Sequence, residues 1–291
     1  MKVIFNMNKL SMQNISVMNV QYWHYSFEYF LDSMEECGLH NIELWAGAPH
    51  FYYEDYSCPH DRTRAITALR KEIESRDMRI VMFTPEQLNY PVNIAGRDPA
   101  YRSRSIAYFM RHLEIAAEFG TERMFITSGW GLLDEPREES WKRSVDSLQQ
   151  LSQKAESMGM KLVIEQLQPY ESNLVTSCQD MQRLFNEVDS DALQCCVDVV
   201  AMAVVGDTLQ DFFTSMEGKV THIHFADGNP SGHYVWGEGN LPMMDYIHVL
   251  EENDYDGFLT LEINDAIYWD DPHCSIERTA HYLHEYLPGH N

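Results

Sequence analysis

The most constraining feature of this sequence is a regular alternation of short apolar runs with longer amphipathic segments. The short runs have the length and composition of buried strands, and the longer ones carry apolar residues at helical spacing. Eight strands are expected at residues 2–7, 41–45, 79–83, 123–127, 161–165, 193–198, 220–225 and 258–263. Helices expected between them include 22–37, 61–76, 100–119, 138–158 and 243–252. Eight such units in 291 residues predict an α/β fold, the (β/α)8 TIM barrel.

An open, doubly wound sheet is the rival arrangement for alternating strands and helices. It is disfavoured because neither GxGxxG nor GxxxxGK[ST] follows any expected strand. No linker-like Pro/Gly/Ser segment and no block of charge divides the chain. We therefore expect residues 1–291 to form one TIM-barrel domain.

The charge balance and the cysteines limit the partners and the compartment. A formal net charge of -24 argues against nucleic acid, which is bound by clustered Lys and Arg. No run approaches the roughly 20 apolar residues of a membrane span, and the first residues lack the features of a signal peptide. The six cysteines are scattered without a CxxC pair. We expect free thiols, a cytoplasmic protein and no membrane partner.

Four late strands are expected to end on side chains that bind metal ions: Glu165, Asp198, His224 and Glu262. A single acid at a strand end often only marks the start of a polar loop. Four on successive strands indicate more, because the carboxyl ends of barrel strands meet at one mouth. Three carboxylates and one imidazole suit a divalent cation, with Mn²⁺ expected first and Co²⁺, Mg²⁺ or Zn²⁺ possible. His222 shares the face of His224 but lies deeper, so we expect it to support or pack.

Further candidates for the mouth follow earlier strands or lie on a late loop. His50 follows the second strand, Glu86 the third and Trp130 the fourth, and each could contact a substrate or simply belong to a loop or the core. Trp130 could also form part of an aromatic wall against a sugar face. His233 lies on the glycine-containing loop after the seventh strand. Glu171 follows Glu165 by six residues, behind a proline.

The segments "VIEQLQPYES", "CVDVV", "HIHFADG", "GEGNLP" and "LTLEI" resemble the xylose-isomerase-like sugar isomerase/epimerase family. Within that family the chain is similar to the ketose 3-epimerases. The segments "TPE…NYP", "PYESN" and "HY…GEG" look most like the fructoselysine 3-epimerase branch. The resemblance implies a xylose-isomerase-like barrel that acts on a small-molecule sugar, as a homodimer or homotetramer.

The resemblance also implies roles for individual residues. Glu165, Asp198, His224 and Glu262 would hold the metal, and Glu165 and Glu262 would double as the acid/base pair. Glu171 matches a position that contacts the sugar. The chemistry fits, because inverting a carbon next to a ketone needs a metal to stabilise an enediolate and two carboxylates to move protons. We therefore predict a metal-dependent isomerase, a 3-epimerase of a free ketohexose or of a ketosamine such as fructoselysine or psicoselysine.

Two departures and several alternatives accompany this prediction. The free-ketose epimerases carry a histidine where this chain has Ala201 and an arginine where it has Pro230. His233 could replace that arginine. An aldose–ketose isomerase or an inosose dehydratase could use the same metal site, and a non-catalytic sugar-binding barrel could retain it. An endonuclease IV-like nuclease would need more His, Glu and Asp ligands, for several zinc ions, and a basic groove, and the net charge of -24 disfavours it.

Overall fold

Eight parallel strands close into a barrel in the computed structural model, which describes residues 10–87 and 91–287. Neighbouring strands pair in chain order, and the ring closes where Ser16 lies opposite Thr260. The strands are β1 (Ile15–Met18), β2 (Asn41–Ala46), β3 (Arg79–Pro85), β4 (Arg123–Thr127), β5 (Lys161–Glu165), β6 (Leu193–Asp198), β7 (Val220–Phe225) and β8 (Phe258–Leu261). The predicted TIM barrel is confirmed.

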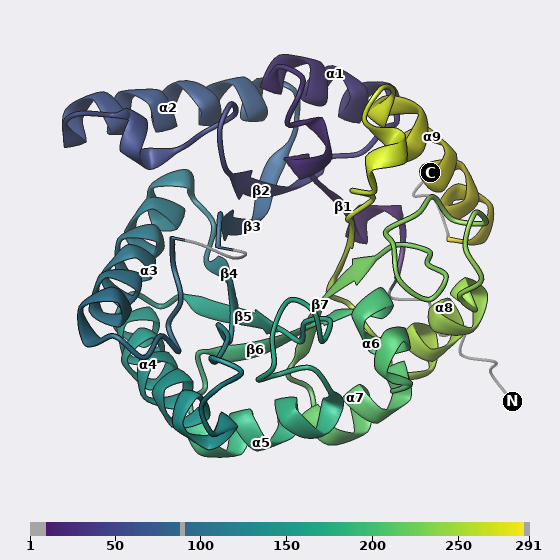
Figure 1. The fold of residues 1–291 in the computed structure, drawn as a ribbon. Helices are drawn as coiled ribbons and strands as arrows, with labels where there is room; N and C mark the ends of the chain where they lie inside the picture. Colours follow the sequence, from purple (N-terminus) through teal and green to yellow (C-terminus); the bar gives the residue numbers. More distant parts are fainter. Residues whose placement is uncertain (1–9, 88–90, 288–291) are drawn as a thin grey trace, which may run out of the picture.

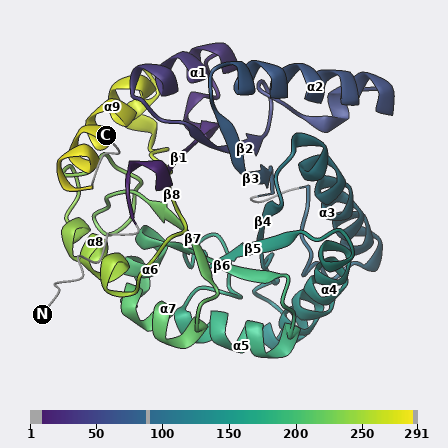
Figure 2. The ribbon, with the colours of Figure 1, turned by 180° about the vertical axis from the view of Figure 1, so that it is seen from behind.

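Helices surround the strands as an outer ring, seen from both sides in Figures 1 and 2. They are α1 (Phe27–Glu36), α2 (Pro59–Ser75), α3 (Pro99–Phe119), α4 (Arg137–Ser157), α5 (Cys178–Val188), α6 (Val199–Val205), α7 (Leu209–Met216), α8 (Met243–Glu252) and α9 (Pro272–Tyr286). The sequence sets their ends. At α3, the Asp98 side chain accepts a hydrogen bond from the Tyr101 amide, and Gly120 ends the helix with a φ of 85°. Within the described residues no helix is long and apolar enough to cross a membrane.

The expected strands match the observed ones best in the middle of the chain, where 123–127, 161–165, 193–198 and 220–225 have the observed bounds. The strand expected at 2–7 lies outside the described residues. The barrel uses Ile15–Met18 as its first strand, which the sequence prediction missed. The strand expected at 258–263 ends at Leu261, so Glu262 follows it. The helix expected at 22–37 begins only at Phe27, because the Ser26 hydroxyl caps it.

Alternate residues of each strand point to opposite sides of the barrel wall. One set packs against the helices in the main core. The other set includes a separate buried cluster of four side chains from β3 to β6: Met82, Phe125, Val163 and Cys196. The ring of Phe125 stacks on that of His224 with 5.3 Å between centroids. This apolar cluster therefore packs directly against the candidate site.

Candidate metal centre and active site

The structure brings together the four residues that the sequence singled out. Glu165 ends β5, Asp198 ends β6, His224 lies one residue before the end of β7, and Glu262 follows β8. The Nδ1 atom of His224 lies 2.5 Å from Glu165 Oε1 and 3.0 Å from Glu262 Oε2. Asp198 joins them through His233, whose Nε2 is 3.2 Å from Asp198 Oδ2 and 3.8 Å from Glu262 Oε2. All five side chains therefore meet at the carboxyl end of the barrel.

The orientation of His224 suits a metal ligand. Its Nδ1 atom makes no hydrogen bond within the described residues, although two carboxylate oxygens lie beside it. Neither contact has the direction of a hydrogen bond. The Nδ1 atom and the two carboxylate oxygens therefore point toward one place without being hydrogen-bonded to each other. Ligand atoms around a cation converge in this way. The residues present therefore fit a divalent metal, with oxygen donors from Glu165, Asp198 and Glu262 and a nitrogen donor from His224.

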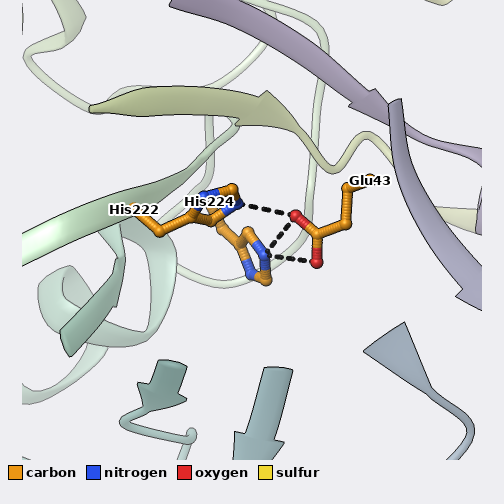
Figure 3. A group of neighbouring side chains, drawn as sticks. All are labelled: Glu43, His222 and His224. Carbon is orange, nitrogen blue, oxygen red and sulfur yellow. Dashed lines mark hydrogen bonds and ion pairs between the residues drawn. The ribbon is translucent and has the colours of Figure 1, made fainter. Parts of the chain in front are cut away.

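Glu43 on β2 belongs to the site, and the sequence analysis missed it. Figure 3 shows its carboxylate facing His222 and His224 from β7. The side chain is completely buried. Glu43 Oε2 lies 2.7 Å from His222 Nε2, and both carboxylate oxygens lie 3.2 Å from His224 Nε2. The sequence signal was present, since "NIELW" places an acid inside an apolar strand, where a charge needs a partner.

His222 lies deeper in the barrel than His224, as predicted. Besides Glu43, its Nε2 atom lies 2.8 Å from the hydroxyl of Thr260, which in turn bonds Ser16 across the β1–β8 seam. Burial lowers the pKa of His222 despite the nearby carboxylate of Glu43, so the ring is neutral at neutral pH. His222 therefore supports Glu43 from below and does not face the predicted ligands Glu165, Asp198 and Glu262.

Cys196 is a second neighbour of the site that the sequence analysis did not select. Its Sγ atom lies 3.8 Å from Glu165 Oε1. Burial raises the pKa of this thiol far above its usual value. Cys196 is also a member of the buried apolar cluster under the site, and its sulfur lies close enough to Glu165 and His224 for the three to share a metal ion.

The mouth concentrates negative charge. Burial raises the pKa of Glu165 to about 8; Asp198 and Glu262 also raise it, against the lowering effect of His224. Burial would lower the pKa of His233, but Asp198 and Glu262 outweigh this effect and raise it to about 9. Both shifts have the sign that clustered carboxylates produce. Such a cluster gains stability from a bound cation.

Glu171, the second acid of "VIEQLQPYES", lies beside this cluster. Its side chain is half-buried, and Oε2 accepts a hydrogen bond from the Gln168 amide at 2.9 Å. Burial raises its pKa, and the charges of Asp198 and Glu262 raise it further. The structure thus places Glu171 within electrostatic reach of the centre.

Glu86 and His50 behave differently from each other. Glu86, which follows β3, accepts a hydrogen bond at Oε2 from the indole of Trp45 on β2 at 2.7 Å. His50 is buried, with Nδ1 2.7 Å from Asn19 Nδ2 and Nε2 3.0 Å from the Tyr25 carbonyl oxygen. Both of its ring nitrogens are engaged within the protein. The structure therefore gives His50 the role of joining the loops after β1 and β2, and leaves neither nitrogen for a sugar.

Trp130 lines a pocket that opens beside Glu171. The pocket has a volume of about 540 Å³ and is lined by Trp130, Gly131, Leu132, Leu133, Pro169, Tyr170, Glu171, Ser172 and Asn173. Leu133 is 91% exposed and Tyr170 78% exposed, so its outer wall presents apolar surface to the solvent. A pocket of this volume with several apolar side chains in its lining is suited to a small organic group.

Fold and site together define a family. The chain belongs to the xylose isomerase-like TIM barrel family, whose sequence model matches residues 31–286. Fructoselysine 3-epimerase of Escherichia coli O157:H7 is 27% identical over 263 residues, which span 90% of this chain and 94% of that protein.

Solved structures have the same fold. D-Psicose 3-epimerase with D-tagatose, from Clostridium cellulolyticum H10, superposes with a TM-score of 0.77 at 17% identity, covering 94% of this chain and 99% of that one. The IOLI protein, solved with a bound zinc atom, superposes with a TM-score of 0.75 at 19% identity, covering 93% and 96%. The family predicted from the motifs is thus confirmed. The prediction of an isomerase is confirmed at the family level, because named relatives are epimerases.

Proposed function

We propose that this protein is a metal-dependent sugar 3-epimerase that inverts the carbon next to the carbonyl of a ketose or ketosamine. The observation that carries the proposal is the approach of Glu165 and Glu262 to one atom, Nδ1 of His224, at the mouth of the barrel. The names of the relatives, fructoselysine 3-epimerase and D-psicose 3-epimerase, support the same class of reaction.

We assign Glu165, Asp198, His224 and Glu262 as the ligands of a divalent cation, and Mn²⁺ as the ion. Hard oxygen donors with one imidazole suit Mn²⁺, and they also admit zinc, the ion bound in the IOLI structure. When bound, the cation supplies Lewis-acid stabilisation of the negative charge that builds up on the substrate's oxygens.

Glu165 and Glu262 form the acid/base pair. One carboxylate takes the proton from the carbon next to the carbonyl, and the other returns a proton to the opposite face. They exchange roles when the reaction runs backwards. Both reach the same position, because their oxygens approach the same imidazole atom. Their side chains are only 8% and 15% exposed, which limits competition from water for the proton.

Glu171, His233, Glu86 and Trp130 are the proposed substrate contacts. Ala201 is buried in α6, so it offers no polar group to the sugar. His233 lies 3.2 Å from Asp198 and provides an imidazole beside the centre from the β7–α8 loop instead.

A substituted substrate fits this mouth better than a free ketose. The pocket beside Glu171 has a volume of about 540 Å³ and apolar walls, which suits a group attached to the sugar. We therefore propose a ketosamine, with the sugar at the metal centre and its substituent in this pocket.

Hydrogen exchange in D₂O tests the proposal directly. Purified protein is stripped of metal, resupplied with Mn²⁺ and incubated in D₂O with fructoselysine, psicoselysine, D-psicose or D-tagatose. The expected result is deuterium at the carbon next to the carbonyl, only when the metal is present. The proposal is wrong if no ketose or ketosamine exchanges and apo and metal-loaded protein behave alike.

Product analysis separates the remaining reactions of such a site. An epimer supports the proposal, an aldose indicates an aldose–ketose isomerase, and loss of water indicates an inosose dehydratase. Sugar binding that is measured by calorimetry without any turnover indicates a non-catalytic barrel.

A further inference from the structure

Three side chains, Thr84, His222 and His224, direct hydrogen-bond donors at the carboxylate of Glu43. Glu43 Oε1 accepts the hydroxyl of Thr84 at 2.6 Å, and Oε2 meets His222 Nε2 at 2.7 Å. Both oxygens also meet His224 Nε2 at 3.2 Å. Glu43 and His222 are fully buried, and His224 is 1% exposed. A carboxylate removed from water in this way is stable only with several donors around it.

These contacts fix which nitrogen of His224 keeps its proton when the ring is neutral, the form in which histidine binds a metal. A carboxylate only accepts hydrogen bonds, so the Nε2 atom that faces Glu43 must be the donor. A neutral imidazole with its proton on Nε2 has its lone pair on Nδ1. Nδ1 is the atom that lies beside Glu165 and Glu262.

We propose that Glu43 is a positioning residue of the metal centre: by accepting the Nε2 proton of His224, it holds the ring with the Nδ1 lone pair directed at the divalent cation. The inference rests on the proposed function, since it takes His224 as a ligand. It adds that the ligand set depends on a carboxylate from β2, on the far side of His224 from Glu165 and Glu262. Carboxylates that bond metal-binding histidines typically raise metal affinity 10- to 100-fold.

Thr84 and His222 explain why this residue has to be an acid. They direct two further donors at the carboxylate, which can accept all three. A glutamine would have to turn its amide NH₂ toward one of these donors, and one bond would become a repulsive contact. Glu43→Gln therefore keeps the volume of the side chain but weakens the hydrogen bond that orients the His224 ring.

Zinc affinity is the first readout of the test, measured by competition with a chelating dye in the wild type, Glu43→Gln and Thr84→Val. Thr84→Val is the matched control, because it removes a donor from the same carboxylate and leaves the bond to His224 in place. We expect zinc binding to weaken 10- to 100-fold in Glu43→Gln and by less than threefold in Thr84→Val. Equal losses in both variants would overturn the proposal, because they would indicate general damage to the cluster.

The second readout is ¹⁵N NMR of histidine-labelled, zinc-loaded wild type, which does not depend on a variant that folds. We expect the His224 signals of a metal-bound Nδ1 and a protonated Nε2. Coordination through Nε2 would overturn the proposal, as would unchanged affinity in Glu43→Gln. If the wild type binds neither Zn²⁺ nor Mn²⁺, the proposed function itself fails, which distinguishes the two failures.

Discussion

At the scale of single residues, the mouth of the barrel combines two kinds of carboxylate. Glu165 and Glu262 lie on the Nδ1 side of His224, and Glu43 lies on its Nε2 side. One imidazole ring therefore separates acids that would face substrate from an acid that is closed off from solvent. Replacing a glutamate by glutamine on the Nδ1 side should affect both catalysis and metal binding, whereas the same change at Glu43 should act through the position of His224.

Glu262→Gln should reduce substrate C–H exchange by about 10²–10⁴-fold, because an amide cannot accept or deliver the proton. It should also weaken Mn²⁺ binding, because a charged ligand is lost. Exchange is measured by NMR in D₂O and metal binding by titration calorimetry. Glu252→Gln, on the exposed face of α8, is the control and should change neither. Wild-type exchange in Glu262→Gln would remove this residue from the acid/base pair.

His112 on α3 should make the protein less stable in mild acid. Burial lowers its pKa to about 4, so below pH 6.5 the unfolded chain takes up a proton that the folded protein does not. Stability is then lost as the pH falls from 6.5 toward 4, by about 1–2 kcal/mol at pH 5. His112→Phe keeps a ring packed against Tyr53 and Tyr108 and should reduce the difference in unfolding free energy between pH 7 and pH 5 by that amount.

Urea unfolding at the two pH values measures this effect. His248→Gln is the control, because that histidine is exposed on α8. An unchanged difference between pH 7 and pH 5 in His112→Phe would show that other groups cause the acid sensitivity.

At the scale of elements, the loop between β7 and α8 is held by one buried acid. Asp227 accepts hydrogen bonds from the amides of Gly228 at 2.8 Å, Gly237 at 2.9 Å and Leu241 at 3.0 Å. Its own backbone pairs with Tyr234. The loop closes so tightly that a Cβ atom on Gly239 would lie 2.3 Å from Asp227 Oδ1. This loop carries His233 to Asp198.

Asp227→Ala should lower the free energy of unfolding by about 2–4 kcal/mol, since it removes charge-assisted bonds to three amides. It should also slow substrate C–H exchange, because His233, a proposed substrate contact, is no longer held beside Asp198. Chemical denaturation and NMR in D₂O measure the two effects. Asp256→Ala, at an exposed position before β8, is the control and should leave both within error. Wild-type exchange in Asp227→Ala would mean that the loop does not position His233 for the substrate.

The elements also explain which parts of the fold were predictable. The strands at 123–127 and 161–165 were placed correctly, because each is an apolar run bounded by a helix end and a polar loop. Strand β1 was missed because "ISVM" is short and lies between polar residues. Its burial comes from pairing with β2 and β8, which a local pattern does not contain.

The residues on the Nδ1 side of His224 could be predicted from the sequence, whereas the role of Glu43 on its Nε2 side could not. Glu165 and Asp198 were found because they end strands, and position along a strand can be read from sequence. Glu43 was missed because its partners, His222 and His224, lie about 180 residues away and meet it only when the barrel closes. Likewise, the sequence around His50 does not show that its two ring nitrogens are hydrogen-bonded to Asn19 and Tyr25, which lie about 30 residues earlier in the chain.

At the scale of the whole molecule, metal binding should stabilise the barrel, because the proposed ligands lie at the carboxyl ends of four different strands. At a Mn²⁺ concentration 100 times the Kd, the gain is about 2.7 kcal/mol, which corresponds to a rise in Tm of roughly 4 °C for a chain of this size. Differential scanning calorimetry with and without EDTA measures it. Asp198→Asn should show a smaller rise at the same concentration. An equal rise in that variant would place the stabilising ion elsewhere.

The closing of the ring between β1 and β8 has a consequence for how the enzyme is made. Thr260 and Glu262 are among the last residues of the barrel to be synthesised, whereas Glu43 is among the first. A chain whose last barrel strand has not yet been made therefore carries three of the four proposed ligands, and gains Glu262 only when β8 is made and pairs with β1. We therefore expect activity only after β8 has been made, and a message truncated after β7 should yield a product that contributes no activity.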